Sequence, residues 1–339
     1  QILGDRHGNV RHLFDRDCSV QRRHQKLVEE APAPDLPGAL RAAMARDAVR
    51  LAAAIGYEGA GTVEFLVRDG AHFFIEMNTR LQVEHPVTEM ITGIDIVDWQ
   101  LRVASGEALD FSQEAVRCEG AAIELRLLAE DAQADGRPTT GTISAVDEPS
   151  GPGIRVDHAL CPKLVVPPDY DSLLAKIVAH GADREEALTR LGTALRQDLV
   201  AGLTTNQDQL RAIIAHPAFR AGGVDTGFFT AASGLSPSME IGDRERAFAA
   251  LAAHCRDAQA TLSDRASPWA RLGAWRVSEP AGHPGASIWL VAGETVRVAG
   301  RGQRYAVTVA EGPAMMVEHL AHDPGKLRFE NEGRLVTLR

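Results

Sequence analysis

The chain has 339 residues, 45% of them apolar and 24% charged, which is typical of a soluble globular protein with room for two domains. Its net charge of −10 argues against nucleic acid or an anionic membrane as the main partner, and no apolar run approaches the roughly 20 residues needed to span a bilayer. The four cysteines show no paired spacing, so we expect a reduced, intracellular setting without disulfides or zinc.

The N-terminal part predicts a strand pair, a donor-rich segment and a helix. Residues 1–3 and 10–14 are expected to be strands joined by the turn-rich segment 4–9. The run 17–26 contains donors that suit an anionic ligand, although solvated charges at a strand end are the alternative. Residues 37–56 predict a helix that stops at a glycine. Its expected buried positions are Leu40, Met44, Ala48, Leu51 and Ile55.

Two apolar runs, 63–67 and 72–76, predict a hairpin across Asp69-Gly70. A two-residue loop would place Glu64 and Glu76 on opposite faces, whereas a three-residue loop over 69–71 would pair them directly. Facing carboxylates are destabilising unless a cation lies between them, so we expect the second register and a divalent metal. A bulge that separates the two carboxylates is the alternative.

The stretch 76–86 alternates polar and packing residues, as an extended strand with one functional face would. The polar positions are Glu76, Asn78, Arg80, Gln82 and Glu84. Carboxylate and amide oxygens suit Mg²⁺, and the arginine fork suits an oxyanion that the glutamine would also contact. A free carboxylate beside a bound anion, as Glu84 would be, is in the position of a general base. Incidental charges on a solvated strand are the alternative.

Further elements follow in the next hundred residues. A helix over 92–104 is expected to bury Ile94, Val97 and Leu101. A strand over 121–130 contains Arg126 in a mainly apolar run, which indicates an ion pair near Glu124. A helix over 184–200 is followed by one beginning near 203–206.

From about residue 236 the pattern changes to one long helix and a set of short strands. The helix spans 248–262, and glycines separate the strands, which is typical of an antiparallel meander or small barrel. The predicted strands are 287–291, 295–299, 304–309, 315–320, 326–329 and 335–338. Three of the four tryptophans, Trp269, Trp275 and Trp289, lie in this part, and tryptophan is enriched at interface hot spots, although core packing explains any one of them equally well.

The segments 17–26, 59–66, 74–89 and 168–176 closely resemble the biotin carboxylase family of ATP-grasp enzymes. The resemblance runs from residue 1 to about 235 and implies an α+β fold. Residues 1–235 would comprise the second half of an ATP-grasp domain and the biotin carboxylase C-terminal domain. Residues 236–339 would form a small antiparallel β-barrel-like domain with one long helix, which joins the enzyme to a partner protein.

The resemblance also implies roles for individual residues. Bicarbonate would be phosphorylated by MgATP, and the resulting CO₂ would be captured by biotin. The metal, Mg²⁺ or Mn²⁺, would be bound by Glu64, Glu76 and Asn78, and the ATP phosphates by Gln21, His24 and Lys26. Bicarbonate would be held by Arg80, Gln82 and the Val83 backbone and deprotonated by Glu84. Arg126 would stabilise charge on the biotin ring as an oxyanion-hole donor does, with Asp171 nearby. The predicted catalytic residues are Glu84, Arg80, Arg126 and Lys26.

Several expectations concern what lies outside the chain. The family's N-terminal domain, glycine-rich lid and hinge have no counterpart, so we expect an N-terminally truncated sequence. The segment 314–317 has no lysine at a biotin acceptor position, so the biotinyl carrier domain is expected elsewhere, after residue 339. The expected partners are that carrier and a carboxyltransferase β subunit in a hetero-oligomer, in the bacterial cytoplasm or the mitochondrial matrix.

Residues 267–271 and 275–276 resemble the methylcrotonyl-CoA carboxylase α subunits of leucine degradation. The alternatives are a biotin carboxylase for propionyl-, acetyl- or geranyl-CoA, a non-catalytic assembly scaffold, or another ATP-grasp ligase. The intact polar face favours an enzyme over a scaffold.

Overall fold

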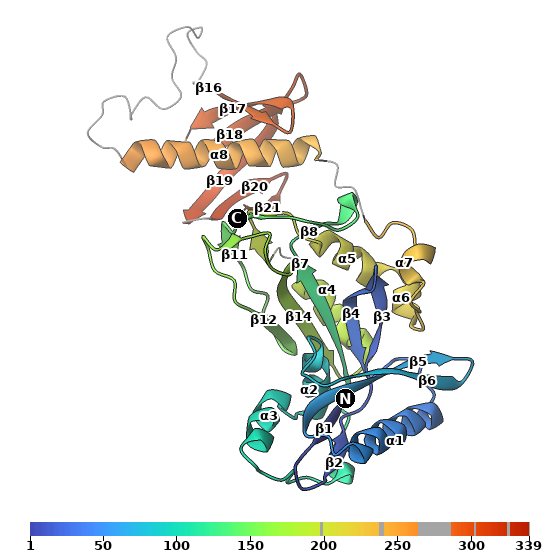
Figure 1. Ribbon diagram of the computed structural model, residues 1–339. Coiled ribbons are helices and arrows are strands. Elements are labelled where there is room, and N and C mark those ends of the chain that lie inside the picture. The colour runs from blue at the N-terminus through green and yellow to red at the C-terminus, as the bar shows by residue number, and fades with distance from the viewer. Residues whose placement is uncertain (197–198, 237–240, 264–285, 302, 324–325, 339) are drawn as a thin grey trace, which may run out of the picture. The chain divides into compact units, whose positions relative to one another are not determined.

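The computed structural model describes residues 1–339 except 197–198, 237–240, 264–285, 302, 324–325 and 339 (Figure 1). Its contacts divide the chain into two compact units, residues 1–238 (unit 1) and 239–339 (unit 2), against an expected boundary at 235 and 236. Helices and antiparallel sheets occur in both units, which confirms the α+β class. Among the described residues, no helix is long and apolar enough to cross a membrane.

The first sheet of unit 1 contains the predicted N-terminal strand pair and hairpin. Its order is β2-β1-β5-β6, and every neighbouring pair is antiparallel. The helices α1 and α3 pack against it. These elements are β1 (Ile2–Gly4), β2 (Val10–His12), β5 (Gly59–Arg68), β6 (Ala71–Asn78), α1 (Gly38–Ala54) and α3 (Ile96–Ala104).

The second sheet of unit 1 has the order β12-β14-β7-β4-β3, also antiparallel throughout. Its central strand, β7, contacts both α2 and α4. Alternation along β7 puts Ile123 and Leu125 in the main core, while Ala122 joins Val87 and Ile91 of α2 in a smaller cluster. The bounds are β3 (Asp17–Arg22), β4 (Gln25–Ala31), β7 (Ala121–Leu128), β12 (Ile154–His158), β14 (Leu173–Gly181), α2 (His85–Thr92) and α4 (Arg184–Ala194).

Short elements complete unit 1. The predicted helix near 203–206 begins after Asn206, which caps α5. The remaining elements are η1 (Gln113–Ala115), β8 (Glu130–Asp131), η2 (Ala132–Ala134), β9 (Arg137–Pro138), β10 (Gly141–Thr142), β11 (Ala145–Val146), β13 (Val165–Val166), β15 (Val200–Ala201), α5 (Gln207–Ala215), α6 (Pro217–Ala221) and α7 (Phe228–Ala231).

The helix predicted over 92–104 is wrong in its start and in its buried face. α2 ends at Thr92 with Gly93 as its left-handed C-cap (φ 68°), and α3 starts at residue 96 with Asp95 as its N-cap. The buried residues of α3 are Ile96, Trp99 and Val103, because this face of the helix packs with Ala60 of β5 in one core cluster. Val97 and Leu101 are 42% and 66% exposed.

The first helix was predicted at nearly its observed position, but its last expected core residue is wrong. α1 ends at Ala54, and Ile55 is 60% exposed because it lies beyond the last helical turn. Leu40 and Ala48 are buried as expected, and Ala52 is buried as well.

Unit 2 consists of α8 (Asp243–Ser263) packed against three strands of a six-stranded sheet (Figure 1). The six predicted strands are confirmed and pair in sequence order, and β16 and β21 are not paired with each other in the described part of the chain, so the sheet is an open meander. Trp289 packs against the core of this unit, whereas Trp269, Trp275 and segments 267–271 and 275–276 lie outside the described residues. The strands are β16 (Ala286–Val291), β17 (Glu294–Arg301), β18 (Arg304–Val309), β19 (Met315–Asp323), β20 (Lys326–Asn331) and β21 (Arg334–Leu338).

Candidate active site

The β5–β6 hairpin places Glu64 directly opposite Glu76, as predicted, but not through the predicted loop. Arg68 pairs with Ala71, so the loop has two residues, 69 and 70, both with positive φ. A bulge restores the register: Glu64 and Phe65 are consecutive on β5, but their partners Glu76 and Phe74 are two residues apart, so the extra residue is Ile75 on β6. The alternative prediction, a bulge that separates the two carboxylates, is therefore wrong: a bulge is present, but it brings them opposite each other.

Asn78 holds this carboxylate pair. Its Nδ2 donates to Oε1 of Glu64 and to Oε1 of Glu76, both at 3.1 Å, and Lys26 Nζ lies 3.0 Å from Glu64 Oε1. Among the described residues, no group of three His, Cys, Asp or Glu side chains could hold a metal by itself. The two carboxylates fit Mg²⁺, which takes one or two carboxylates and leaves other positions to substrate oxygens; Asn78 would add its Oδ1 once its amide turns, because here Nδ2 faces the carboxylates.

The segment after Asn78 is not the extended strand that the alternation predicted. β6 ends at Asn78, where its pairing with Thr62 ends, and residues 79–84 bend and turn into α2. Arg80 is exposed and donates to the Leu81 carbonyl and to Asn78 Oδ1. The polar side chains therefore leave the strand at different angles, and only residues 76 and 78 share its face.

Glu84 lies at the centre of the site. It precedes α2, its side chain is only 2% exposed, and its two oxygens face different cations. Lys26 Nζ is 2.8 Å from Oε1, Arg126 Nη2 is 2.9 Å from Oε2, and the Cys18 thiol donates to Oε1 at 3.8 Å. Burial alone would raise the pKa of Glu84, but Arg16, Lys26 and Arg126 outweigh it and lower the pKa to about 2. Glu84 is therefore a fixed anion.

Arg126 is ion-paired, as its place in an apolar run predicted, but with partners from other elements. Its Nε donates to Oε1 of Glu29 on β4 at 2.6 Å, and its Nη2 reaches Glu84. The carboxylate of Glu124, on the same strand, makes no hydrogen bond to any described residue. Arg126 thus joins the second sheet to the turn that precedes α2.

Two cations of the site were missed by the sequence analysis. Arg16 donates from Nη1 to Gln1 and Thr88 at 2.7 and 2.9 Å, and from Nη2 to Thr62 and Gln82 at 2.9 Å each. All four acceptors are neutral, and no described carboxylate forms an ion pair with Arg16. Its only sequence signal was its place one residue before the donor-rich run 17–26.

Lys176 is the second. Its Nζ donates to the Val83 carbonyl at 3.1 Å and is ion-paired with Asp157 at 3.2 Å. Lys176 is the last residue of the segment 168–176. This segment lies next to the turn at Val83 because of the strand order in the sheet, which no local sequence pattern predicts. Gln82, expected to contact bicarbonate, is buried and bridges Glu64 and Arg16 through its amide.

Three predicted residues lie away from these contacts. Gln21 is opposite Lys26 across β3 and β4, and its Nε2 donates to the Cys18 carbonyl at 2.7 Å. His24 is exposed in the β3–β4 turn with φ 66°. Asp171 is exposed and accepts the Leu173 N–H. Their predicted roles toward ATP and biotin stay predictions.

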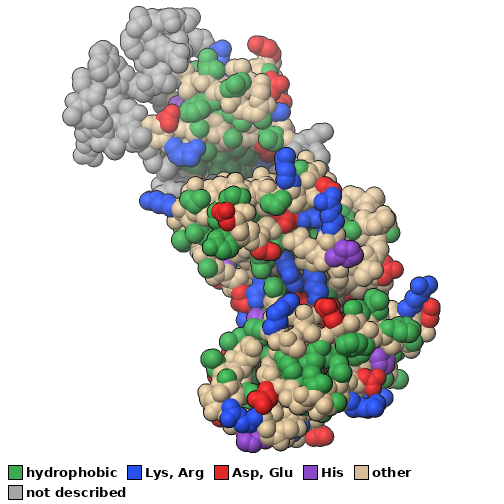
Figure 2. All heavy atoms as spheres, viewed as in Figure 1, with side chains coloured by type: hydrophobic (Ala, Val, Ile, Leu, Met, Phe, Trp, Pro, Cys, Tyr) green, Lys and Arg blue, Asp and Glu red, His purple; other side chains and the backbone are tan. Residues whose placement is uncertain are grey.

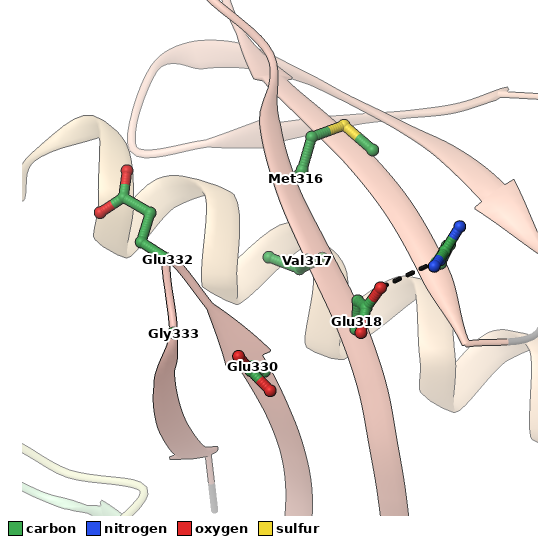
Figure 3. A pocket seen from close by; sticks show the side chains of 7 residues that line it. Met316, Val317, Glu318, Glu330, Glu332 and Gly333 are labelled. Atoms are coloured by element: carbon green, nitrogen blue, oxygen red, sulfur yellow. Dashed lines mark hydrogen bonds and ion pairs between the residues drawn. The ribbon is translucent and has the colours of Figure 1, made fainter.

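The surface gives two further features. Figure 2 shows apolar side chains gathered over the β5–β6 hairpin, where Leu66, Phe73 and Phe74 are 55%, 57% and 55% exposed. A separate pocket in unit 2 contains Arg304, paired with Glu318 at 2.9 Å, and is otherwise lined by residues 316–317, 330 and 332–333 (Figure 3). Neither feature adds a cation or a base to the site around Glu84.

Comparison with known families gives two matches within unit 1. Residues 1–112 match the carbamoyl-phosphate synthase L chain ATP-binding domain, and residues 124–231 match the biotin carboxylase C-terminal domain. The biotin carboxylase of Nostoc sp. is 49% identical over 229 residues, or 67% of this chain and 51% of that protein. The alpha chain of the mitochondrial methylcrotonoyl-CoA carboxylase of Dictyostelium discoideum is 44% identical over 284 residues, or 82% of this chain and 41% of that protein.

A solved structure agrees with these matches. The biotin carboxylase domain dimer of Hydrogenobacter thermophilus 2-oxoglutarate carboxylase, in complex with MgADP, ADP and bicarbonate, superimposes with a TM-score of 0.69 at 45% identity. The match covers 70% of this chain and 53% of that one. The chain thus spans about half the length of its relatives. In unit 1, the chain belongs to the biotin carboxylases of the biotin-dependent carboxylases, an ATP-grasp family.

Proposed function

We propose that the full-length protein is the biotin carboxylase component of an acyl-CoA carboxylase, which uses ATP and bicarbonate to carboxylate biotin on a carrier domain. The observation that carries this proposal is the position of Glu84. Its carboxylate is shared by Lys26 and Arg126, and Lys26 also reaches Glu64 of the facing carboxylate pair. One lysine thus connects a candidate metal site to a candidate site for an anionic substrate.

The roles of the residues follow from these contacts. Glu64, Glu76 and Asn78 would hold Mg²⁺, which when bound neutralises charge on the ATP phosphates. Lys26 would contact the transferred phosphoryl group or bicarbonate. The exposed Arg80 has no carboxylate partner among the described residues, so its guanidinium is free to bind an oxyanion.

Glu84 is a weak base in this arrangement. A general base works best with a pKa near the working pH, and three cations hold the pKa of Glu84 near 2. For Glu84 to accept a proton from bicarbonate, a cation must leave it. Arg126 is the suitable one, because a biotin ring oxygen competing for its guanidinium would weaken the Arg126–Glu84 pair. Proton removal and biotin activation would then be coupled.

We infer that the acyl-CoA is 3-methylcrotonyl-CoA. Support comes from the length of one match: 284 residues exceed the 238 of unit 1, so the similarity to the alpha chain of the Dictyostelium methylcrotonoyl-CoA carboxylase extends into unit 2. Propionyl-, acetyl- and geranyl-CoA are the alternatives. Unit 2 would then bind a carboxyltransferase partner, because its described residues carry no assembled catalytic group.

Two measurements test the proposal. Purified full-length protein should cleave ATP only when bicarbonate and Mg²⁺ are present, and should carboxylate free biotin. Together with its co-purifying partner it should carboxylate 3-methylcrotonyl-CoA faster than the other three acyl-CoA substrates. ATP cleavage that does not depend on bicarbonate would contradict the enzymatic role, and a preference for another acyl-CoA would contradict only the branch.

A further inference from the structure

Two buried carboxyl groups face each other behind Arg126. Glu29 on β4 is paired with Glu124 on β7, and both side chains are fully buried. Oε1 of Glu29 accepts from Arg126, whereas Oε2 of Glu29 and both oxygens of Glu124 make no hydrogen bond to any described residue. Neither glutamate belongs to the substrate contacts proposed above, so the pair needs another explanation.

Neighbouring charges affect the pKa values of Glu29 and Glu124 differently. Burial raises the pKa of Glu29, which Arg126 opposes; burial also raises the pKa of Glu124, and the charge of Glu29 raises it further. Glu124 faces Val178 directly across β7 and β14; Lys176 and Arg126, two residues further along these strands, lower its pKa, but burial and Glu29 outweigh them. The charged groups that act on this pair from the surrounding elements are Arg126 on β7, Lys26 on β4, Lys176 on β14 and Glu84 before α2.

We propose that Glu29 is the positioning residue that orients Arg126 toward biotin, and that Glu124 behind it stays protonated in the folded protein. Two ionised carboxylates facing each other in a fully buried site would repel each other, so one keeps its proton. Glu29 is the ionised member because Arg126 donates to it at 2.6 Å.

The geometry explains why Arg126 needs Glu29. The guanidinium is held by Glu29 on one side and by Glu84 on the other. If Arg126 turns from Glu84 toward a biotin oxygen, Glu29 is the partner that remains and keeps the arginine on its strand. A neutral Glu124 leaves the negative charge of Glu29 fully directed at Arg126. This role rests on the proposed function, since it serves the biotin step.

The catalytic test compares two charge-removing substitutions in the full-length protein. Glu29→Gln should lower kcat for carboxylation of free biotin by about 10- to 100-fold, as loss of an oriented oxyanion donor does. Bicarbonate-dependent ATP cleavage measured without biotin, and the KM for ATP, should change by less than about threefold, because Arg126 stays paired with Glu84 in both proteins when biotin is absent. Glu124→Gln, which resembles a protonated glutamate, should change both activities by less than about threefold.

The second test does not depend on activity. A glutamate whose folded pKa is raised stabilises the folded state below its unfolded pKa of 4.5, and this stability is lost as the pH rises toward the folded pKa. Glutamine cannot ionise, so the thermal unfolding midpoint of Glu124→Gln relative to the unsubstituted protein should rise as the pH increases from about 5 to 8. Glu58→Gln, an exposed control, should show no such trend.

Each outcome decides part of the inference. Equal losses of biotin carboxylation and ATP cleavage in Glu29→Gln, or no loss, would overturn the positioning role. A pH-independent midpoint difference for Glu124→Gln, or a loss of activity as large as that of Glu29→Gln, would overturn the neutral glutamate. If the unsubstituted protein lacked bicarbonate-dependent ATP cleavage, the proposed function would fail, while the pH dependence of unfolding would still decide the protonation of Glu124.

Discussion

Replacing Glu84 by glutamine tests whether charge holds the centre of the site together. The substitution keeps the shape of the side chain but removes the negative charge that Lys26 and Arg126 face at 2.8 and 2.9 Å. Those cations would then remain around a neutral side chain in a position that is only 2% exposed. Breaking a buried ion pair by removing one partner is strongly destabilising. We therefore expect E84Q to lower the free energy of unfolding of unit 1.

The size of this effect follows from the pKa of Glu84. Burial would raise that pKa, but Arg16, Lys26 and Arg126 lower it from 4.5 to about 2. One pKa unit corresponds to about 1.4 kcal/mol, so the folded state favours the carboxylate by about 3 kcal/mol. A depressed pKa gives stability that is present above the unfolded pKa and is lost as the pH falls toward the folded pKa. E84Q should therefore cost about 3 kcal/mol at pH 7, and its difference from the parent protein should shrink by about 1 kcal/mol near pH 4.

Urea unfolding at several pH values measures this difference. Circular dichroism follows the helices and strands, and fluorescence of Trp99, which is 6% exposed and is the one tryptophan in the sequence of unit 1, helps to assign its transition. Glu58→Gln is the matched control because Glu58 is exposed. If E84Q and E58Q unfolded at the same urea concentration at pH 7, or if their difference did not depend on pH, the charge-based account of Glu84 would be refuted.

The remaining predictions concern the other parts of the site. Glu76→Gln should raise the Mg²⁺ concentration needed for ATP cleavage and slow it by about 10²-fold, and unchanged kinetics would refute the metal assignment. Arg126→Met should reduce biotin carboxylation at least about tenfold more than bicarbonate-dependent ATP cleavage; equal losses would count against its role. Lys176→Met should raise the KM for bicarbonate about tenfold by releasing the Val83 carbonyl, with Lys176→Arg closer to the parent enzyme. Deleting residues 239–339 should abolish co-purification of a carboxyltransferase partner but leave free-biotin carboxylation within about twofold, and continued assembly would disprove docking through unit 2.

The elements that the sequence predicted best are those set by local pattern. The six strands of unit 2 follow alternating apolar runs between glycines, and all six are present. The hairpin across Asp69-Gly70 was also predicted, because an Asp-Gly pair between apolar runs is a strong hairpin signal, although its loop has two residues and not the expected three. Its register required the bulge at Ile75, for which the sequence offers no distinct marker. The prediction reached the correct pairing through the repulsion of two carboxylates, which was a chemical argument and not a geometric one.

Contacts between distant segments could not be predicted in the same way. The partners of Arg126 lie 97 and 42 residues away in sequence, at Glu29 and Glu84. Lys176 reaches Val83 only because β14 lies beside β7 and α2 contacts both strands. The buried face of α3 was predicted wrongly for a related reason. It is set by packing against β5, which is distant in sequence, so Trp99 is in the core and Leu101 is exposed.

The charges around Glu84 are arranged so that a bound cation and a bound anion favour each other. Glu64 accepts from both Lys26 and Gln82, and Gln82 in turn accepts from Arg16, whose four contacts are all to neutral oxygens. If Glu64 turned its charge toward Mg²⁺, Lys26 would keep Glu84 as its remaining carboxylate partner, and Arg16 would still act on Glu84 through its charge. Both cations would then exert more positive potential on the space beside Glu84, where bicarbonate or a phosphoryl group would bind. The affinity for the anion should rise with Mg²⁺ concentration, and by thermodynamic reciprocity the affinity for Mg²⁺ should rise with the anion to the same extent.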